Sequence, residues 1–343
     1  MAQIPTVRLL ILSLLAACGG GGSDEPGNPS QFSLSLSDAP VDNAQKVCIA
    51  IAGLRLNDDS GTEQASWSVL DLLPTDNQDG CLPSGYTLPT SSNGAPRFLY
   101  LDLLHYQQGD SFALLSNTPL AAGSYGQLRL QIEDGRSNTL DGAGRPHPSS
   151  YVVDANGNTL PLEVPSSELK LHGFTAPANG VARFQLEFNL RHAMVLPGHG
   201  NYYKLKPNGV SLLEVGTLAT LQGDISQGLC ADDLTKAGVY LYPARQGSAL
   251  AYLGLNAPIS DGGPVLTTRV QAATDSTPAH YQLDYVTTGQ YDLQLVCNAA
   301  EDAVLDSGSS DFIPVLGSSQ LGITVDPTLS NPQQLDFIAA PAP

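Results

Sequence analysis

Short stretches of alternating apolar and polar residues dominate the chain, and this two-residue period predicts β-strands rather than helices. Phe32-Ser33-Leu34-Ser35-Leu36 has the period of a half-buried strand, whereas Val47 to Ile51 is a continuous apolar run typical of a buried one. Asn156-Gly157 is turn chemistry and predicts a hairpin between residues 151–153 and 160–164. Further strands are expected at residues 127–132, 169–171, 182–190 and 202–205.

The strand pattern restarts after residues 214–218, which indicates a domain boundary. Five more strands follow, at residues 219–225, 238–242, 279–285, 289–297 and 320–325. The predicted fold class is all-β, with two antiparallel β-sandwich domains at residues 31–215 and 216–338 and a tail at 339–343. Polar residues 60–95, with their Gly and Pro, predict a long loop. Residues 98–107 predict a short helix, with a strand as the alternative.

The N-terminus has the features of an export signal. Arg8 precedes the apolar run from Leu9 to Leu15, which is too short to span a bilayer. Ala16-Ala17-Cys18 resembles a bacterial lipobox, so we expect a signal peptide at residues 1–17, a diacylglyceryl group on Cys18, and a flexible tether at 18–30. Ordinary secretory cleavage, with an incidental cysteine, is the alternative.

The residue after the lipobox cysteine bears on localisation. Gly19 stands there instead of an aspartate, and by resemblance to Gram-negative lipoproteins this favours the outer membrane. The sequence leaves open whether the domains face the periplasm or the cell surface.

The charge balance excludes nucleic acid as a partner. Lys and Arg number 15 against 33 Asp and Glu, and the formal net charge is −18. A phosphate backbone needs a basic surface that this chain lacks. With 42% hydrophobic residues the chain has the material for folded cores.

Four cysteines remain once Cys18 is set aside: Cys48, Cys81, Cys230 and Cys297. An even count in an exported chain predicts disulfides, with three arrangements open. We favour Cys48–Cys81 and Cys230–Cys297 because each pair then falls within one domain. The spacing matches no metal-binding cysteine motif.

Several stretches resemble a bacterial family, the domain of unknown function 4382. They are residues 38–42 (DAPVD), 101–104 (LDLL), 120–130 (LAAGSYGQLRL), 164–171 (VPSSELKL) and 203–207 (YKLKP), so the resemblance covers about residues 31–215. It implies a bacterial lipoprotein with no assigned activity. Residues 219–338 resemble a carboxypeptidase-regulatory-like, prealbumin-type β-sandwich, through stretches 221–225, 239–242 and 288–293.

No catalytic motif is present, so we expect a protein that is not an enzyme. The chain contains no G-x-S-x-G, HExxH, P-loop or dinucleotide fingerprint. The opposing hypothesis, an unrecognised hydrolase, would require a pocket with converging carboxylates or a Ser/His pair.

Cofactors are not expected, and calcium is the one alternative because the chain is rich in oxygen ligands. The metal candidates are Asp38 and Asp42, which flank a proline turn and more simply cap backbone donors. A polar site that they share with Glu187 and Asn189 is a further hypothesis. The acidic loops at 57–61 and 154–158 lack the EF-hand pattern and are interpreted as turns.

Sugar binding requires exposed aromatic side chains. Tyr240 and Tyr242 share one strand face, and Tyr202 and Tyr203 lie near the domain junction. Such rings stack on sugars, although tyrosines also cover sandwich cores with their hydroxyls in water.

The sequence therefore predicts a non-catalytic, lipid-anchored envelope protein that binds or scaffolds an envelope partner. The alternative is a surface lipoprotein for carbohydrate- or calcium-dependent ligand binding and adhesion. Its expected partners are the membrane, through the anchor, and an envelope protein or glycan.

Overall fold

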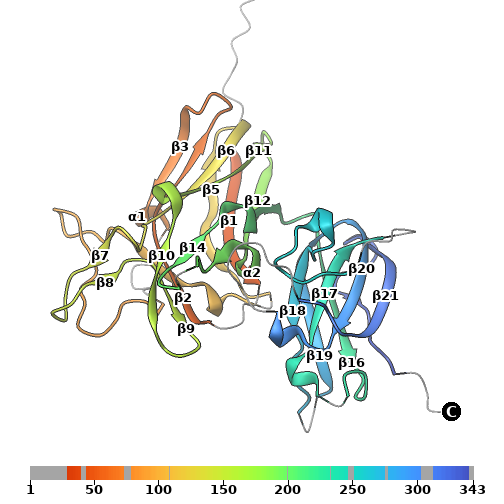
Figure 1. The fold of residues 1–343 in the computed structure, drawn as a ribbon. Coiled ribbons are helices and arrows are strands. Elements are labelled where there is room, and N and C mark those ends of the chain that lie inside the picture. Colours follow the sequence, from red (N-terminus) through yellow and green to blue (C-terminus); the bar gives the residue numbers. More distant parts are fainter. Residues whose placement is uncertain are drawn as a thin grey trace, which may run out of the picture.

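The computed structural model describes residues 29–39, 44–72, 79–107, 109–198, 200–231, 233–245, 251–274, 277–302 and 312–339. The protein is built from β-sheets, as predicted, and forms two sandwich-like halves that lie side by side (Figure 1). No strand of the described residues is shared between a sheet of one half and a sheet of the other. The predicted signal peptide, Cys18, most of the tether and Asp42 lie outside the described residues.

The N-terminal half packs a four-stranded sheet against a nine-stranded one. The first sheet has the order β15 (Val210–Glu214), β12 (Val181–Asn189), β1 (Ser30–Ala39), β5 (Phe112–Leu120). The second runs β11 (Glu168–Ala176), β6 (Gly123–Ile132), β2 (Ala44–Asn57), β9 (Tyr151–Asp154), β10 (Thr159–Glu163), β14 (Tyr203–Leu205), β13 (Met194–Val195), and β2 also pairs with β3 (Glu63–Ser68) and β4 (Leu99–Asp102). A small ribbon joins β7 (Thr139–Leu140) to β8 (His147–Pro148).

The alternation seen in the sequence becomes the core of this half. Phe32, Leu34 and Leu36 of β1 are fully buried and pack with Phe184 and Leu186 of β12. The serines between them point to the opposite face of the sheet, because successive strand residues point to opposite sides. The polar face of this sheet is therefore available for contact with the other half.

The C-terminal half contains two smaller sheets around its own core. One has the order β19 (Ala279–Thr287), β16 (Leu218–Ile225), β22 (Gln333–Gln334), and the other β18 (Leu266–Arg269), β17 (Gly238–Pro243), β20 (Gly289–Val296), β21 (Leu316–Val325). Leu221, Leu241, Tyr281 and Leu293 are among the fully buried residues between them. Most pairings in the protein are antiparallel, but β1–β12, β10–β14 and β16–β22 are parallel.

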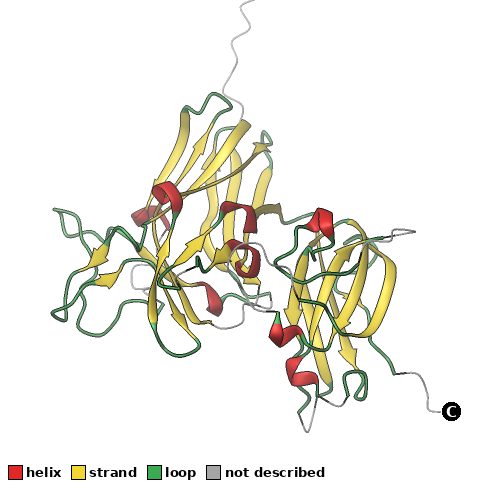
Figure 2. Ribbon diagram, viewed as in Figure 1, coloured by secondary structure: helices red, strands yellow, loops and turns green. Residues whose placement is uncertain are grey.

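Helices are short and lie at strand ends (Figure 2). They are α1 (Val69–Leu72), α2 (Leu190–Ala193) and the 3₁₀ turns η1 (Leu103–His105), η2 (Pro165–Ser167), η3 (Pro207–Gly209), η4 (Leu234–Lys236), η5 (Ile259–Asp261) and η6 (Ala299–Glu301). None of the described helices has the length and apolar content needed to cross a membrane.

Two sequence expectations need correction. The expected loop at 60–95 contains strand β3, because Trp67 pairs with Leu54 of β2 and stacks on Phe32. The helix expected at 98–107 is instead strand β4 followed by the 3₁₀ turn η1. The alternative prediction, a strand, is therefore confirmed for residues 99–102.

Both disulfides form in the favoured arrangement, Cys48 with Cys81 and Cys230 with Cys297. Each lies within one half. Because disulfides persist in oxidising compartments, the protein is extracytoplasmic.

Candidate functional site

The site begins with the parallel pairing of β1 and β12. Its register sets Ser37 opposite Glu187 and Asp38 opposite Phe188, at the end of both strands. Ser37 and Glu187 thus share the polar face of the sheet, and this end of the face is covered by the C-terminal half. Each of these residues is less than one-tenth exposed.

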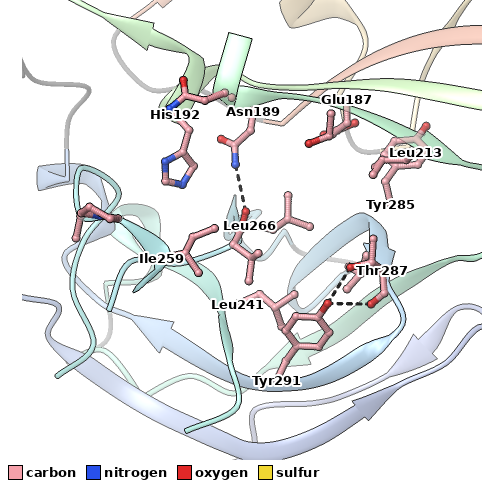
Figure 3. A pocket seen from close by; sticks show the side chains of 17 residues that line it. Glu187, Asn189, His192, Leu213, Leu241, Ile259, Leu266, Tyr285, Thr287 and Tyr291 are labelled. Atoms are coloured by element: carbon pink, nitrogen blue, oxygen red, sulfur yellow. Dashed lines mark hydrogen bonds between the residues drawn. The ribbon is translucent and has the colours of Figure 1, made fainter. Parts of the chain in front are cut away.

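A cavity of about 440 Å³ lies between the two halves at this point (Figure 3). The N-terminal half contributes Glu187, Asn189, His192 and Leu213, from β12, α2 and β15. The C-terminal half contributes a mostly apolar wall that includes Leu241, Ile259, Leu266, Tyr285, Val286 and Tyr291. The volume lies in the 300–1,000 Å³ range of small-molecule sites.

Glu187 is a buried acid with one hydrogen-bond donor. The Ser37 hydroxyl donates to its Oε2. Burial raises the pKa of Glu187 to about 8, and the negative charge of Asp284 from β19 contributes to the rise. The carboxyl is therefore mostly protonated at neutral pH.

Asp38 lies beside it and is also buried. Gln107 Nε2 donates to its Oδ2 at 2.8 Å, while its Oδ1 has no hydrogen-bond partner. Burial raises the pKa of Asp38 well above its usual value, more than the Gln107 hydrogen bond lowers it, and nearby Glu187 adds to the rise. Burial thus raises the pKa of both acids at this junction.

Asn189 and His192 also belong to the polar part of the cavity wall, with Asn208, Ser211 and Thr287. Asn189 Nδ2 donates to the Val265 carbonyl at 3.4 Å, across the junction, but its Oδ1 is buried without a partner. His192 Nε2 is also buried without one. Burial lowers the pKa of His192, so the ring is neutral at pH 7.

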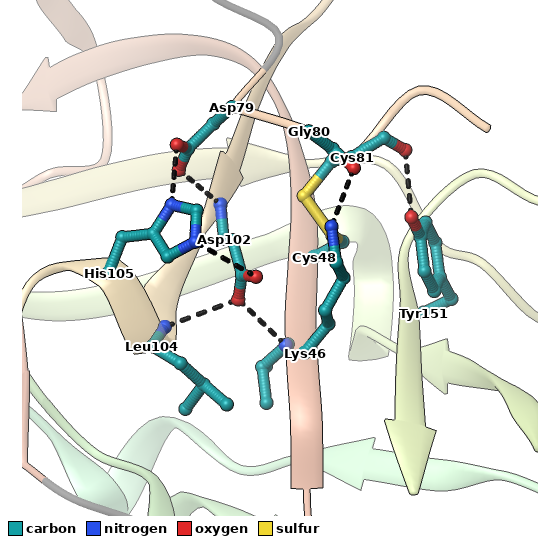
Figure 4. Close-up of polar contacts among 10 residues, drawn as sticks. Lys46, Cys48, Asp79, Gly80, Cys81, Asp102, Leu104, His105 and Tyr151 are labelled. Carbon is teal, nitrogen blue, oxygen red and sulfur yellow. Dashed lines mark hydrogen bonds and ion pairs between the residues drawn. A yellow bond between two sulfur atoms is a disulfide. The ribbon is translucent and has the colours of Figure 1, made fainter. Parts of the chain in front are cut away.

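A second buried acid, Asp102, lies deeper in the N-terminal half and is well supplied with donors (Figure 4). Its Oδ1 accepts from the backbone N–H groups of Val47 at 3.0 Å and Leu104 at 3.3 Å. His105 Nε2 lies 3.7 Å from its Oδ2, and His105 Nδ1 lies 2.7 Å from Asp79 Oδ1. This network joins β2, η1 and the segment beside the Cys48–Cys81 disulfide.

The described residues give no support to the metal site predicted from the sequence. Within the described ranges, no group of three or more His, Cys, Asp or Glu side chains is arranged to hold a metal ion. Asp58 Oδ1 accepts from the N–H groups of Ser60 and Thr62, and Asp154 Oδ1 accepts from those of Asn156 and Asn158. The two acidic loops are therefore turns held by their own aspartates.

The tyrosine platform is absent where it was expected. Tyr240 and Tyr242 are fully buried and belong to a small hydrophobic cluster that includes Leu255 and Val296. Their hydroxyls donate to Asp302 and to the Leu253 carbonyl rather than to water. Both expectations for this face, a sugar platform and hydroxyls in water, are wrong because residues after β17 fold back over it.

Sequence reasoning brought together Asp38, Glu187 and Asn189, and the structure places all three at the junction. It missed His192 and the whole wall from the C-terminal half. The signal for the site was present in the stretch 182–190, where Gln185, Glu187 and Asn189 lie on the nominally exposed face yet are buried.

Comparisons with known proteins give a family and no assigned activity. The family described as a domain of unknown function, DUF4382, matches residues 29–207, more than half of the 343-residue chain. No curated protein matches the chain.

Three solved structures illustrate what the fold comparison finds. The Bacillus anthracis TIE protein aligns with 11% identity and a TM-score of 0.17, over 90% of this chain and 34% of that one. A candidate cell adhesion protein from Bacteroides fragilis aligns with 11% identity and a TM-score of 0.21, over 92% of this chain and 95% of that one. A leucine-rich repeat protein from Bacteroides thetaiotaomicron aligns with 12% identity and a TM-score of 0.15, over 92% of this chain and 26% of that one. TM-scores this low do not establish a shared fold, and the chain spans only about a third of the first protein's length.

Proposed function

The chain belongs to the DUF4382 family, and on that premise we propose that it is a non-catalytic cell-envelope protein that binds a small ligand between its two halves. Cys18 carries the lipid anchor, and the outer membrane is its location. The C-terminal half, with two small sheets around one core, acts as a prealbumin-type accessory sandwich that supplies one wall of the site.

One observation carries the binding proposal: the junction cavity joins mostly apolar walls to a few polar side chains. Glu187, Asn189 and His192 line it from the N-terminal half, and Leu241 and Leu266 line it from the C-terminal half. An apolar pocket of this size with a few convergent polar groups is the usual form of a ligand site.

The anchor proposal rests on the sequence from Arg8 to Cys18 and on the two disulfides, which agree with export. Labelling of growing cells with an alkyne fatty acid tests it. Label on the wild type and on Ser23→Ala, but not on Cys18→Ser, supports the anchor. Equal labelling of Cys18→Ser would contradict it.

Binding is tested with N-phenylnaphthylamine, a neutral fluorophore that brightens in apolar sites. We expect saturable fluorescence with the wild type and a large loss with Leu213→Trp, which fills the cavity from a partly exposed wall position. Leu321→Trp is the matched control, because Leu321 is 65% exposed on β21, away from the cavity. Undiminished binding by Leu213→Trp would place the probe elsewhere and reject the site.

A further inference from the structure

We propose that a second cavity, beside the ribbon of β7 and β8 in the N-terminal half, binds an uncharged sugar. This site is separate from the junction, because no described residue lines both cavities. The ribbon lies on the side of the N-terminal half that faces away from the C-terminal half (Figure 1). Three observations carry the proposal: the polar lining of the cavity, the charged groups that have no protein partner there, and the contacts that hold its walls.

The lining of this cavity is the reverse of the lining at the junction. Its volume is about 400 Å³, within the range of roughly 300–1,000 Å³ for small-molecule sites. Eight of the ten described residues that line it are polar or charged, and only Pro89 and Phe98 are apolar. Thr87, Ser137 and Thr139 are exposed and bring hydroxyl groups to the wall. The cavity therefore calls for a hydrophilic ligand.

Three charged side chains line the same cavity: Arg97, Glu133 and Asp141. The guanidinium carbon of Arg97 lies 5.2 Å from the centre of the Phe98 ring, but among the described residues no side chain forms an ion pair with any of the three. Burial raises the pKa of Glu133, and the positive charge of Arg97 partly offsets that rise. Arg97 and Asp141 are exposed and Glu133 is only partly buried, so a molecule in the cavity can reach all of them.

Hydroxyl groups are the ligand groups that suit this mixture. A guanidinium only donates hydrogen bonds and a carboxylate only accepts them, whereas a hydroxyl does both. Neighbouring hydroxyls on one sugar ring can therefore accept from Arg97 and donate to Glu133 or Asp141. The same ring can exchange hydrogen bonds with the protein hydroxyls of Thr87 and Thr139.

A ligand with a net charge of either sign fits less well. An anion that pairs with Arg97 would lie beside the acidic groups of Glu133 and Asp141, and a cation that pairs with those acids would lie beside Arg97. The next charges preserve this balance, since Asp134 lies close to Glu133 and Arg145 lines a neighbouring pocket together with Asp141. Like charges at this spacing oppose binding.

The walls of the cavity are held in place by the protein itself. The Cys48–Cys81 disulfide fixes the start of the segment that leads to Thr87. Tyr86 forms a backbone bridge with Gly142, and its hydroxyl donates to the Arg145 carbonyl at 3.1 Å. On the opposite wall, the Ser149 N–H donates to the Asn138 carbonyl at 3.0 Å. A site ordered in advance loses less entropy when a ligand binds.

A glycan array that carries neutral, sialylated, sulfated and amino sugars tests the proposal. Because each hydrogen bond exchanged with water yields little net affinity, the purified protein is biotinylated and presented as streptavidin tetramers, which raise the avidity. We expect binding to neutral glycans. The strongest of them is then titrated in solution against the wild type and the variants.

Two variants assign the binding to this cavity. Thr87→Trp fills it and Arg97→Ala removes its guanidinium, and each should weaken binding at least tenfold; both positions are exposed, and an unchanged melting temperature confirms folding. Ser92→Trp, at an exposed turn of the same segment, and Arg183→Ala, on the exposed surface of β12, are the matched controls and should bind like the wild type.

Each contrary outcome overturns a stated part of the proposal. Absence of binding to every glycan would reject the sugar site, and wild-type affinity in both Thr87→Trp and Arg97→Ala would reject its location. Binding confined to sialylated, sulfated or amino sugars would overturn the uncharged class. Displacement of the bound glycan by free glycine would show that a zwitterion, rather than a sugar, fits between Arg97 and Glu133.

Discussion

The N-terminal half contains two buried acidic sites that are built in opposite ways. Asp102 receives two backbone N–H groups and faces His105, whereas Glu187 receives only the Ser37 hydroxyl, and Asp38 receives the Gln107 side chain and a backbone hydrogen bond from Leu190. Both sites are almost fully buried. In the first, backbone N–H groups donate to the carboxyl; in the second, burial raises the pKa of both acids.

We infer from this difference that Asp102 stabilises the fold, whereas the junction acids belong to the proposed ligand site. A carboxylate whose oxygens serve the backbone of β2 and η1 ties those elements together, so its removal must damage the structure. An acid that lies beside unpartnered polar atoms at an apolar cavity adds little to stability. Four predictions test this contrast, beginning with the largest effect.

Removing the disulfide beside Asp102 should have the largest effect. The double variant Cys48→Ser with Cys81→Ser opens a loop spanning a sequence separation of 33 residues, and the chain-entropy relation gives a loss of about 3–4 kcal/mol in the free energy of unfolding. The segment that holds Asp79 against His105 is released as well. Urea denaturation measures the loss, and a change below 1 kcal/mol would show that this region is not stabilising.

Truncating the well-bonded acid comes next. Asp102→Ala leaves the buried N–H group of Val47 and the partly buried N–H group of Leu104 without their acceptor, so we expect a loss of about 2–4 kcal/mol. Glu187→Gln is the matched change at the other site and should cost little at pH 7, because glutamine retains an acceptor for Ser37. Equal losses from the two variants would erase the contrast.

The pH dependence of stability should come from the junction. Because the pKa of Glu187 rises from 4.5 when unfolded to about 8 when folded, the folded state holds the extra proton between these values. Stability should therefore fall as pH rises through this window, by up to about 1.4 kcal/mol per pH unit for this carboxyl. In Glu187→Gln that contribution disappears, and Asp38 retains a slope of the same sign. Parallel curves for the two proteins between pH 5 and pH 8 would contradict the assignment.

The smallest effect is expected at His105. Its side chain is 54% exposed, so its ion pairs with Asp79 and Asp102 are screened by water. His105→Ala should lower the free energy of unfolding by less than about 1 kcal/mol. A loss as large as that of Asp102→Ala would mean that the histidine, and not the backbone donors, stabilises the buried acid.

Much of the fold could be read from local pattern. The hairpin around Asn156-Gly157 forms as expected, with Leu160 paired to Val152, because turn chemistry and strand period are local properties. The serines and apolar residues of β1 alternate between polar face and core as predicted. Each of these features depends on residues that are close in sequence.

The junction could not be read in the same way. No residue near Glu187 in the sequence indicates that Leu266 and Tyr285 cover the polar face of its sheet. Those residues lie about 80 to 100 positions later in the chain. Tyr240 and Tyr242 have the alternation of a half-exposed strand, yet later segments bury them. The sequence shows only that Gln185, Glu187 and Asn189 interrupt the largely apolar stretch 182–190.

The central claim is that the junction cavity binds a small ligand. A crystal structure of the protein with N-phenylnaphthylamine bound tests it most directly. The account predicts the ring system between Leu213 and Leu266, which line the cavity from the two halves. N-phenylnaphthylamine bound at another surface, with none in the cavity, would contradict it.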